Sequence, residues 1–185
     1  MRSITILALT LLSGATAGFA QPPFKASPNP VSDTVREMLA RESKNLIGSA
    51  ELLPAEKYGY EPTPAQTSFG QLMAHVVQTN VALCSAIAGT PAPMTPDELK
   101  KLSGADPKSA LVAAVKKSFD YCTEGLAKTR DTDLGDEVSM FGRRTGQSRG
   151  AAMVTLAADW ADHYSTAASY LRLNGILPPT AQPKK

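Results

Sequence analysis

Apolar residues recur at helical spacing in four long stretches of the chain. These stretches are residues 32–53, 68–89, 107–130 and 148–174. In each of them apolar side chains stand three and four positions apart, which is the period of one face of an α-helix. No segment alternates apolar and polar residues convincingly enough to predict a strand. The pattern predicts an all-α domain with four long helices.

Capping residues sharpen the ends of these helices. Thr67 or Ser68 precedes the second long helix and Gly89 follows it, as expected for an N-cap and a left-handed C-terminal residue. In the connector of residues 89–106, Thr95 and Glu98 have the spacing of a capping box, which predicts one short helix. A connector of this length can return along a bundle. We expect a four-helix bundle with helices 2 and 3 parallel, joined by a long connector carrying a short helix.

Composition divides the chain into four parts. Residues 1–20 have a basic start at Arg2, a short apolar run and small residues before Gln21, typical of a secretory signal peptide cut after Ala20. The apolar run is too short to span a bilayer comfortably, so we expect no stable membrane anchor. Residues 21–30 are a Pro-rich lead-in, residues 31–177 the bundle, and residues 178–185 a flexible tail. We predict an exported protein, periplasmic or extracellular.

The charge balance narrows the possible partners. The chain has 19 basic and 17 acidic residues, a formal charge of +2, which becomes +1 when Arg2 is removed with the signal peptide. No Lys/Arg cluster dominates one stretch, and so small a charge argues against nucleic acid as a partner.

The two cysteines bear on the direction of the helices. Cys84 lies sixteen residues beyond Ser68, and Cys122 lies fifteen beyond Pro107. The thiols stand at nearly the same height if these helices are parallel, and are offset by roughly 15 Å if they are antiparallel. Exported proteins with two cysteines usually pair them, so we favour a Cys84–Cys122 disulfide. The alternative is two buried free thiols.

The fourth stretch places two ionisable groups on an otherwise apolar face. This face comprises Ala152, Leu156, Asp159, His163, Ala167 and Tyr170. A charge there is costly unless it is paired or bound to a metal ion. The other histidine of the chain, His75, falls at a comparable depth if the second and fourth helices are antiparallel. Two nitrogens and one oxygen are typical of a three-ligand site with an open position for water, with zinc the default outside the cell.

Other interpretations of these residues stay open on spacing alone. Asp159 and His163, four positions apart, also fit a plain helix ion pair. A lone histidine such as His75 is often a hydrogen-bonded core residue. Arg149, at the start of the fourth helix, is a candidate substrate-binding residue, because free backbone amides there also attract an anion, but a structural role fits it equally well.

Two segments resemble the DinB-like family of metalloenzymes: "LLPAEKYGYEPTPAQTSFGQLMAHVVQTNVALCSAIAG" (residues 52–89) and "LAADWADHYSTAASYLRLNGILPP" (residues 156–179). The resemblance follows the whole mature chain in element order. It implies a four-helix bundle with helices 2 and 3 parallel, and three metal-binding histidines, one on helix 2 and two on helix 4 at i and i+4. Carried over, His75 and His163 match two ligands, and Asp159 stands where the family has its third histidine. A carboxylate can still ligate, with an altered metal preference, or the exchange marks weakened binding.

The resemblance also implies a chemistry. Some relatives transfer low-molecular-weight thiols or isomerise thiol conjugates, and a metal-bound water would permit hydrolysis. Such thiols are mainly cytoplasmic, which is a difficulty for an exported protein. We expect a divalent metal ion, zinc first, with nickel, manganese or iron as alternatives, and transferase or hydrolase activity on an unknown small molecule. The alternative is a non-catalytic bundle for binding or dimerisation, including a homodimer, with a degenerate metal site.

Overall fold

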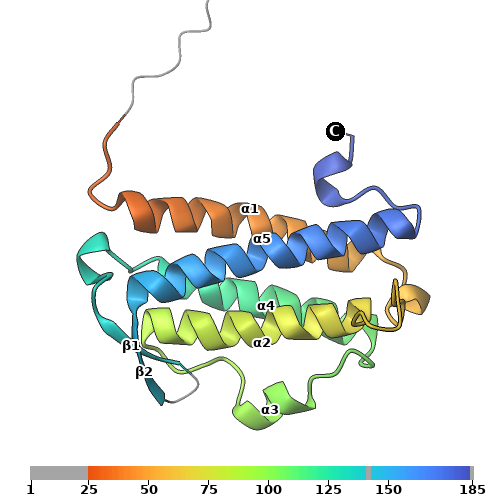
Figure 1. Ribbon diagram of the computed structural model, residues 1–185, viewed down its shortest axis with the longest axis horizontal. Coiled ribbons are helices and arrows are strands. Elements are labelled where there is room, and N and C mark those ends of the chain that lie inside the picture. Colours follow the sequence, from red (N-terminus) through yellow and green to blue (C-terminus); the bar gives the residue numbers. More distant parts are fainter. Residues whose placement is uncertain (1–24, 141–142, 184–185) are drawn as a thin grey trace, which may run out of the picture.

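The computed structural model describes residues 25–140 and 143–183 (Figure 1). The predicted signal peptide, residues 1–20, lies outside the described residues. Within them the α-helices are α1 (Pro30–Leu52), α2 (Phe69–Ala88), α3 (Pro96–Lys101), α4 (Lys108–Leu126) and α5 (Arg149–Leu173). The strands are β1 (Glu137–Met140) and β2 (Arg143–Ser148), and short 3₁₀ turns cover Ala55–Lys57, Asp131–Asp133 and Pro179–Ala181. The predicted mostly helical class is confirmed.

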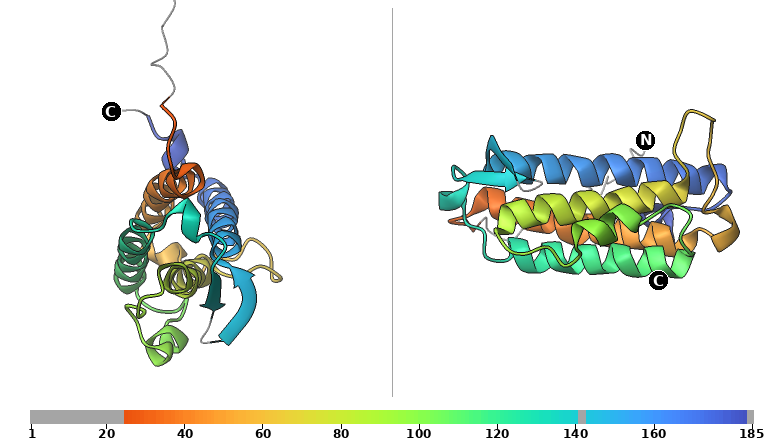
Figure 2. Two further views of the ribbon diagram at one scale, coloured as in Figure 1. Left: turned by 90° about the vertical axis from the view of Figure 1, so that its left-hand side faces the viewer. Right: turned by 90° about the horizontal axis from the view of Figure 1, so that it is seen from below.

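The four long helices lie side by side along the longest axis of the molecule (Figures 1 and 2). Both α2 and α1 pack against α4 and α5. A hydrogen bond joins Asn80 to Ser118 and a disulfide joins Cys84 to Cys122, each across 38 positions. A constant offset means that α2 and α4 run in the same direction. The short α3 lies outside the four long helices, beside α2 (Figure 2). No helix in the described ranges is long and apolar enough to cross a membrane.

The predicted helix caps are present. Ser68 accepts a hydrogen bond from the Gln71 amide, and the Gln71 side chain accepts one from the Ser68 amide. Thr95 and Glu98 form the same reciprocal box at the start of α3. Gly89, which ends α2, has φ 65°, a left-handed conformation that residues with a Cβ adopt at a cost. These ends were predictable because each depends on neighbouring residues only.

The segment between α4 and α5 contains a β-hairpin, and the expectation of no strand was wrong. β1 and β2 pair antiparallel, with Glu137 opposite Ser148 and a register shift between Val138 and Ser139. Val138 is buried, and β1 packs against α2. A strand of four residues leaves too short an alternation to recognise. The hairpin is therefore set by its contact with α2 rather than by its own pattern.

α4 ends at Leu126, four residues before the end that its sequence pattern predicted. The guanidinium of Arg36, on α1, donates to the carbonyl oxygens of Leu126 and Thr129 at 3.0 and 3.1 Å. The Leu126 carbonyl is among those that a helix end leaves without an intrahelical partner, and Thr129 lies in the turn that follows. A side chain from α1 thus stabilises the earlier end.

The start of α1 is capped by a residue far along the chain. Its N-cap residue, Asn29, makes no side-chain capping bond. The Asp131 carboxylate instead accepts from the backbone amides of Val31 (2.9 Å) and Ser32 (2.8 Å) and from the Ser32 hydroxyl (2.7 Å). Burial opposes the ionisation of Asp131, but these hydrogen bonds outweigh it and lower its pKa. A residue 99 positions later therefore completes the first turn of α1.

The end of the chain, expected as a flexible tail over residues 178–185, lies against α1 as far as the structure describes it. Pro178 is buried, and a Cβ at Gly48 would stand 3.0 Å from the Pro179 ring. The Tyr164 hydroxyl, on α5, lies 2.6 Å from the Thr180 hydroxyl. Gly48 supplies the space for this contact, a signal that only a folded neighbour reveals.

Candidate metal centre

The site lies between α2 and α5, which run in opposite directions. Trp160 of α5 donates to the side-chain oxygen of Asn80 of α2 at 2.7 Å. Further along, the rings of His163 and His75 lie 4.9 Å apart between centroids. Residue numbers fall on α2 as they rise on α5, so the helices are antiparallel. This is the geometry that brings both histidines of the chain to one depth.

Three potential ligand atoms meet in this seam. One from each of His75, Asp159 and His163 lies within 4.8 Å of the other two. The His163 side chain is 11% exposed and the Asp159 side chain 20%, whereas His75 is exposed. The group therefore begins in the core and opens to solvent at His75. A site of this form is held firmly on α5 and accessible from the α2 side.

The orientation of His163 suits it to bind a cation. Its Nδ1 lies 2.6 Å from the backbone oxygen of Asp159, one turn earlier on the same helix. A carbonyl oxygen only accepts, so Nδ1 carries the proton and Nε2 of the neutral ring keeps its lone pair. A hydrogen bond from the other ring nitrogen to a carbonyl is the usual support of a metal-binding histidine.

Asp159 and His75 make fewer contacts than an ion-paired aspartate and a hydrogen-bonded core histidine would make. The Asp159 carboxylate lies 3.5 Å from Nδ1 of His163, longer than a charge-assisted hydrogen bond of about 2.7–2.9 Å. Within residues 25–140 and 143–183, no hydrogen bond reaches the His75 ring; its contact is the His163 ring. Because His75 is exposed, it is not a hydrogen-bonded core residue. Both side chains therefore have atoms available to bind a metal ion.

The donor set fits a divalent ion. Imidazole nitrogens and a carboxylate oxygen are ordinary zinc ligands, with bonds of about 2.0–2.2 Å that hold ligand atoms roughly 3–4 Å apart. The separations here, up to 4.8 Å, close to that range by small side-chain rotations. Three protein ligands leave a coordination position for a small molecule.

Arg149 does not lie beside this group. Its guanidinium donates to the backbone oxygens of Ile87 and Asp133 and lies 3.5 Å from the Asp136 carboxylate. On α5 it precedes Asp159 by ten residues, about 15 Å along the helix axis. Its contacts tie the start of α5 to the end of α2 and to the turn before β1.

Cys84 and Cys122 form a disulfide with a Cα–Cα distance of 5.2 Å, and both residues are fully buried. The bond joins α2 to α4. It is a structural cross-link rather than part of the histidine group.

Asn80 is a residue that sequence reasoning missed. It is fully buried, donates to the Ser118 hydroxyl at 3.0 Å and accepts from Trp160. One amide thus links α4, α2 and α5, five residues from His75. The signal was an asparagine inside the apolar run "TNVALC", since a buried amide needs partners on other elements.

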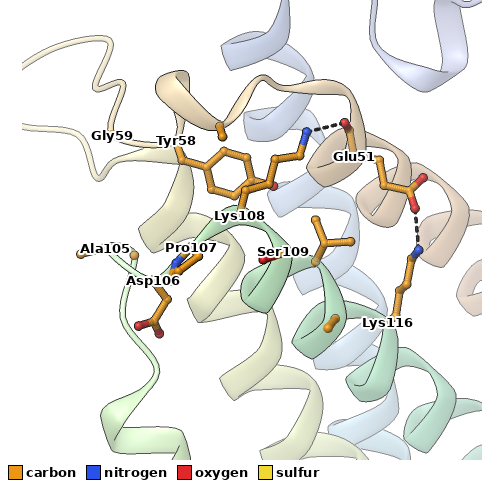
Figure 3. Close-up of a pocket in the computed structure, with 13 residues that line it drawn as sticks. Glu51, Tyr58, Gly59, Ala105, Asp106, Pro107, Lys108, Ser109 and Lys116 are labelled. Carbon is orange, nitrogen blue, oxygen red and sulfur yellow. Dashed lines mark hydrogen bonds and ion pairs between the residues drawn. The ribbon is translucent and has the colours of Figure 1, made fainter.

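One sizeable cavity lies away from the histidines. It measures about 940 Å³ and lies between the end of α1 and the start of α4 (Figure 3). Lys108 donates to the carbonyl oxygens of Glu51 and Leu53 at 2.7 Å each, and Lys116 pairs with the Glu51 carboxylate at 2.6 Å. Burial, and then the charge of Glu51, raise the pKa of Tyr58. Lys108, Lys116 and Glu51 are thus bonded within the protein, so the polar groups here join the end of α1 to the start of α4.

Comparison with models of known protein families assigns the chain to a family. The model of the DinB superfamily matches residues 38–167, more than half of the sequence. The chain belongs to the DinB superfamily. This confirms the resemblance seen in the sequence.

Solved structures of other DinB-like proteins share the fold of this DinB-superfamily chain. One from Bacillus cereus is 17% identical, with a TM-score of 0.63 over 80% of this chain and 95% of that one. One from Bacillus subtilis is 17% identical, with a TM-score of 0.61 over 82% and 99%. A mycothiol-dependent maleylpyruvate isomerase is 15% identical, with a TM-score of 0.57 over 72% of this chain and 59% of the isomerase. No curated protein sequence matches significantly.

Proposed function

We propose that this DinB-superfamily chain is an exported metalloenzyme, a transferase or hydrolase that acts on a small molecule. His75, Asp159 and His163 would hold one divalent ion, with zinc the first candidate and nickel, manganese or iron the alternatives. The observation that carries the proposal is the approach of three ligand atoms, from two helices, to within 4.8 Å of one another. The DinB-like family commonly binds a divalent metal ion, which supports the same assignment.

The three candidate ligands would have different roles, according to how deeply each is buried. His163, fixed by its bond to the Asp159 carbonyl, would be the rigid ligand. Asp159 would contribute the negative charge that offsets part of the charge of the ion. His75, the exposed member, would bind at the rim, where a small molecule enters. We propose that the four long helices supporting them are the four-helix bundle of the family.

A divalent ion in such a site lowers the pKa of a bound water or thiol and polarises a carbonyl oxygen. Hydrolysis needs only water as the second reactant, which suits an exported protein. Thiol transfer is the second candidate, because a structural relative is a mycothiol-dependent isomerase. No serine or cysteine nucleophile lies in the group, and both cysteines are in the disulfide.

Export is part of the proposal. The pattern of residues 1–20 supports it, and so does a disulfide, which persists in oxidising compartments. Expression of the whole chain in a bacterial host, followed by mass measurement of the periplasmic protein, tests it. We expect a chain that begins at Gln21. A protein found in the cytoplasm with residues 1–20 still attached would contradict export.

The decisive test is metal content by elemental analysis of protein purified without a histidine tag. We expect close to one divalent ion per chain, lost in the His75→Ala/His163→Ala double variant. Asp162→Asn is the matched control, because Asp162 is exposed on the same helix and outside the group. Wild-type protein that binds no metal, even after incubation with zinc, would overturn the proposal in favour of a non-catalytic bundle that binds a partner or dimerises.

A further inference from the structure

A second cavity lies along α2, and its lining begins one helical turn beyond His75. It measures about 910 Å³ and is enclosed by α2, the connector carrying α3, β1 and the start of α5. Along α2 its lining begins at Gln78 and reaches Gly89. Eleven helical residues span about 16 Å, so the cavity is long in the direction of the helix axis. Its size is within the range of small-molecule sites.

The cavity and the metal centre share one face of α2. Ala82 and Ala86, which line the cavity, follow His75 by seven and eleven positions, about two and three helical turns. Gln78, at the near end of the lining, is one turn from His75. Its side chain donates to the Leu99 carbonyl at 3.1 Å, which holds α3 over this face. His75 does not itself line the cavity, but a molecule that fills it and extends one helical turn past Gln78, about 5 Å, would come level with the exposed histidine.

Eight of the sixteen lining residues are apolar, and Ser85, Thr90, Glu137 and Ser139 add polar groups to the wall. The apolar members are Val81, Ala82, Ala86, Ala92, Met94, Pro96, Leu99 and Val138. At the far end, the guanidinium of Arg149 is engaged by two carbonyl oxygens and Asp136. Lys100 also lines the cavity, next to Leu99, and no contact engages its ammonium group within the described residues. Positive charge is thus available near Gln78 and at the proposed ion.

We propose that this cavity binds the alkyl chain of an elongated substrate whose carboxyl-type head group lies at His75, Asp159 and His163. The inference rests on the proposed function and names its substrate class: a fatty-acyl or similar alkyl compound. The apolar walls accept the chain, and Lys100 together with the divalent ion attracts the head.

The test uses n-alkyl hydroxamates of two to ten carbons as probes, because a hydroxamate head binds zinc and its chain length is free to vary. Titration calorimetry on the zinc-loaded protein should show affinity rising two- to fourfold per methylene, as for buried alkyl groups. Ala82→Trp, which fills the near end of the cavity, should abolish this rise but keep the affinity for acetohydroxamate. Ala113→Trp, in the cavity of Figure 3, is the matched control and should keep the rise.

The outcomes separate the inference from the proposed function. If acetohydroxamate binds but longer chains bind with no higher affinity, the cavity does not bind alkyl chains, and the proposed metal centre is unaffected. If the protein takes up no zinc, the proposed function fails. Decanoate binding to the metal-free protein then tests whether the cavity accepts an alkyl chain. Binding that Ala82→Trp abolishes and Lys100→Glu weakens severalfold supports the cavity. Absent binding, or binding unchanged by Ala82→Trp, overturns it.

Discussion

The two sides of α2 make contacts of different kinds. Toward α4, the helix is joined by a covalent bond between Cys84 and Cys122 and by the Asn80–Ser118 hydrogen bond, all fully or almost fully buried. Toward α5, the seam carries His75, Asp159 and His163, whose burial decreases from the core to the surface. One seam has all its bonding groups occupied, and the other leaves ligand atoms unused.

This difference indicates a division of roles along a single helix. The cross-linked seam stabilises the packing of α2 against α4 and carries none of the candidate ligand atoms. The open seam is then free to carry polar groups that contribute little to stability. A site built on rigid elements holds its ligands more accurately than one built on loops.

Removing the disulfide should have the largest effect on stability. Cys84→Ala/Cys122→Ala should lower the free energy of unfolding by about 4 kcal/mol, the chain-entropy value for a loop of this size. Urea unfolding of the oxidised wild type and the variant measures the difference. Below its unfolding transition the variant should still bind metal, and its failure to do so would remove the distinction between the seams.

Asp159→Asn should act on the open seam alone. An amide oxygen lacks the charge of the carboxylate, so zinc affinity should fall by at least about 100-fold, since even changes to the residues that support metal ligands cost about 10- to 100-fold. Competition with a chromophoric chelator measures the affinity, with Asp162→Asn as the control. The melting temperature of the metal-free variant should stay close to that of the wild type. A large loss of stability with unchanged zinc affinity would identify Asp159 as a structural residue.

Asn80→Leu should affect both seams, because Asn80 bonds to Ser118 and to Trp160. The buried indole N–H of Trp160 loses its partner, which should cost about 2 kcal/mol. Urea unfolding measures the loss, and zinc competition shows whether the position of α5 on α2 has shifted. Weaker zinc binding in this folded variant is expected, and unchanged binding would show that Asn80 does not position the site.

Acidification should destabilise the protein at the start of α1, which belongs to neither the α2–α4 nor the α2–α5 contact. The pKa of Asp131 is lowered by its bonds to the start of α1, so its contribution is complete above the ordinary aspartate pKa of about 3.9 and is lost as pH falls through the lowered value. Asp131→Asn should melt below the wild type at pH 7, with the gap shrinking in acid. A gap that does not change between pH 7 and pH 2 would exclude the carboxylate as its cause.

What the sequence predicted depended on local signals. The boxes at Ser68 and Thr95 were predictable because a cap is read from four consecutive residues. His75, Asp159 and His163 were found because their polarity contrasts with an apolar face. The contacts made by Val138, Asp131 and Pro179 were not predictable, since each joins segments whose proximity only the fold creates. Asn80 lies between these cases: its polarity was visible, but its partners were not.

The long-distance cap on α1 has a consequence for the order of events during synthesis. Ser32 leaves the ribosome 99 residues before Asp131 is available, a delay of about 5–20 s at ordinary elongation rates. Until shortly before the end of that interval the first helix lacks both its cap and a complete α4, and α5 follows later still. A nascent chain that completes its first helix late stays unfolded for longer, which is the state that the export proposed above requires.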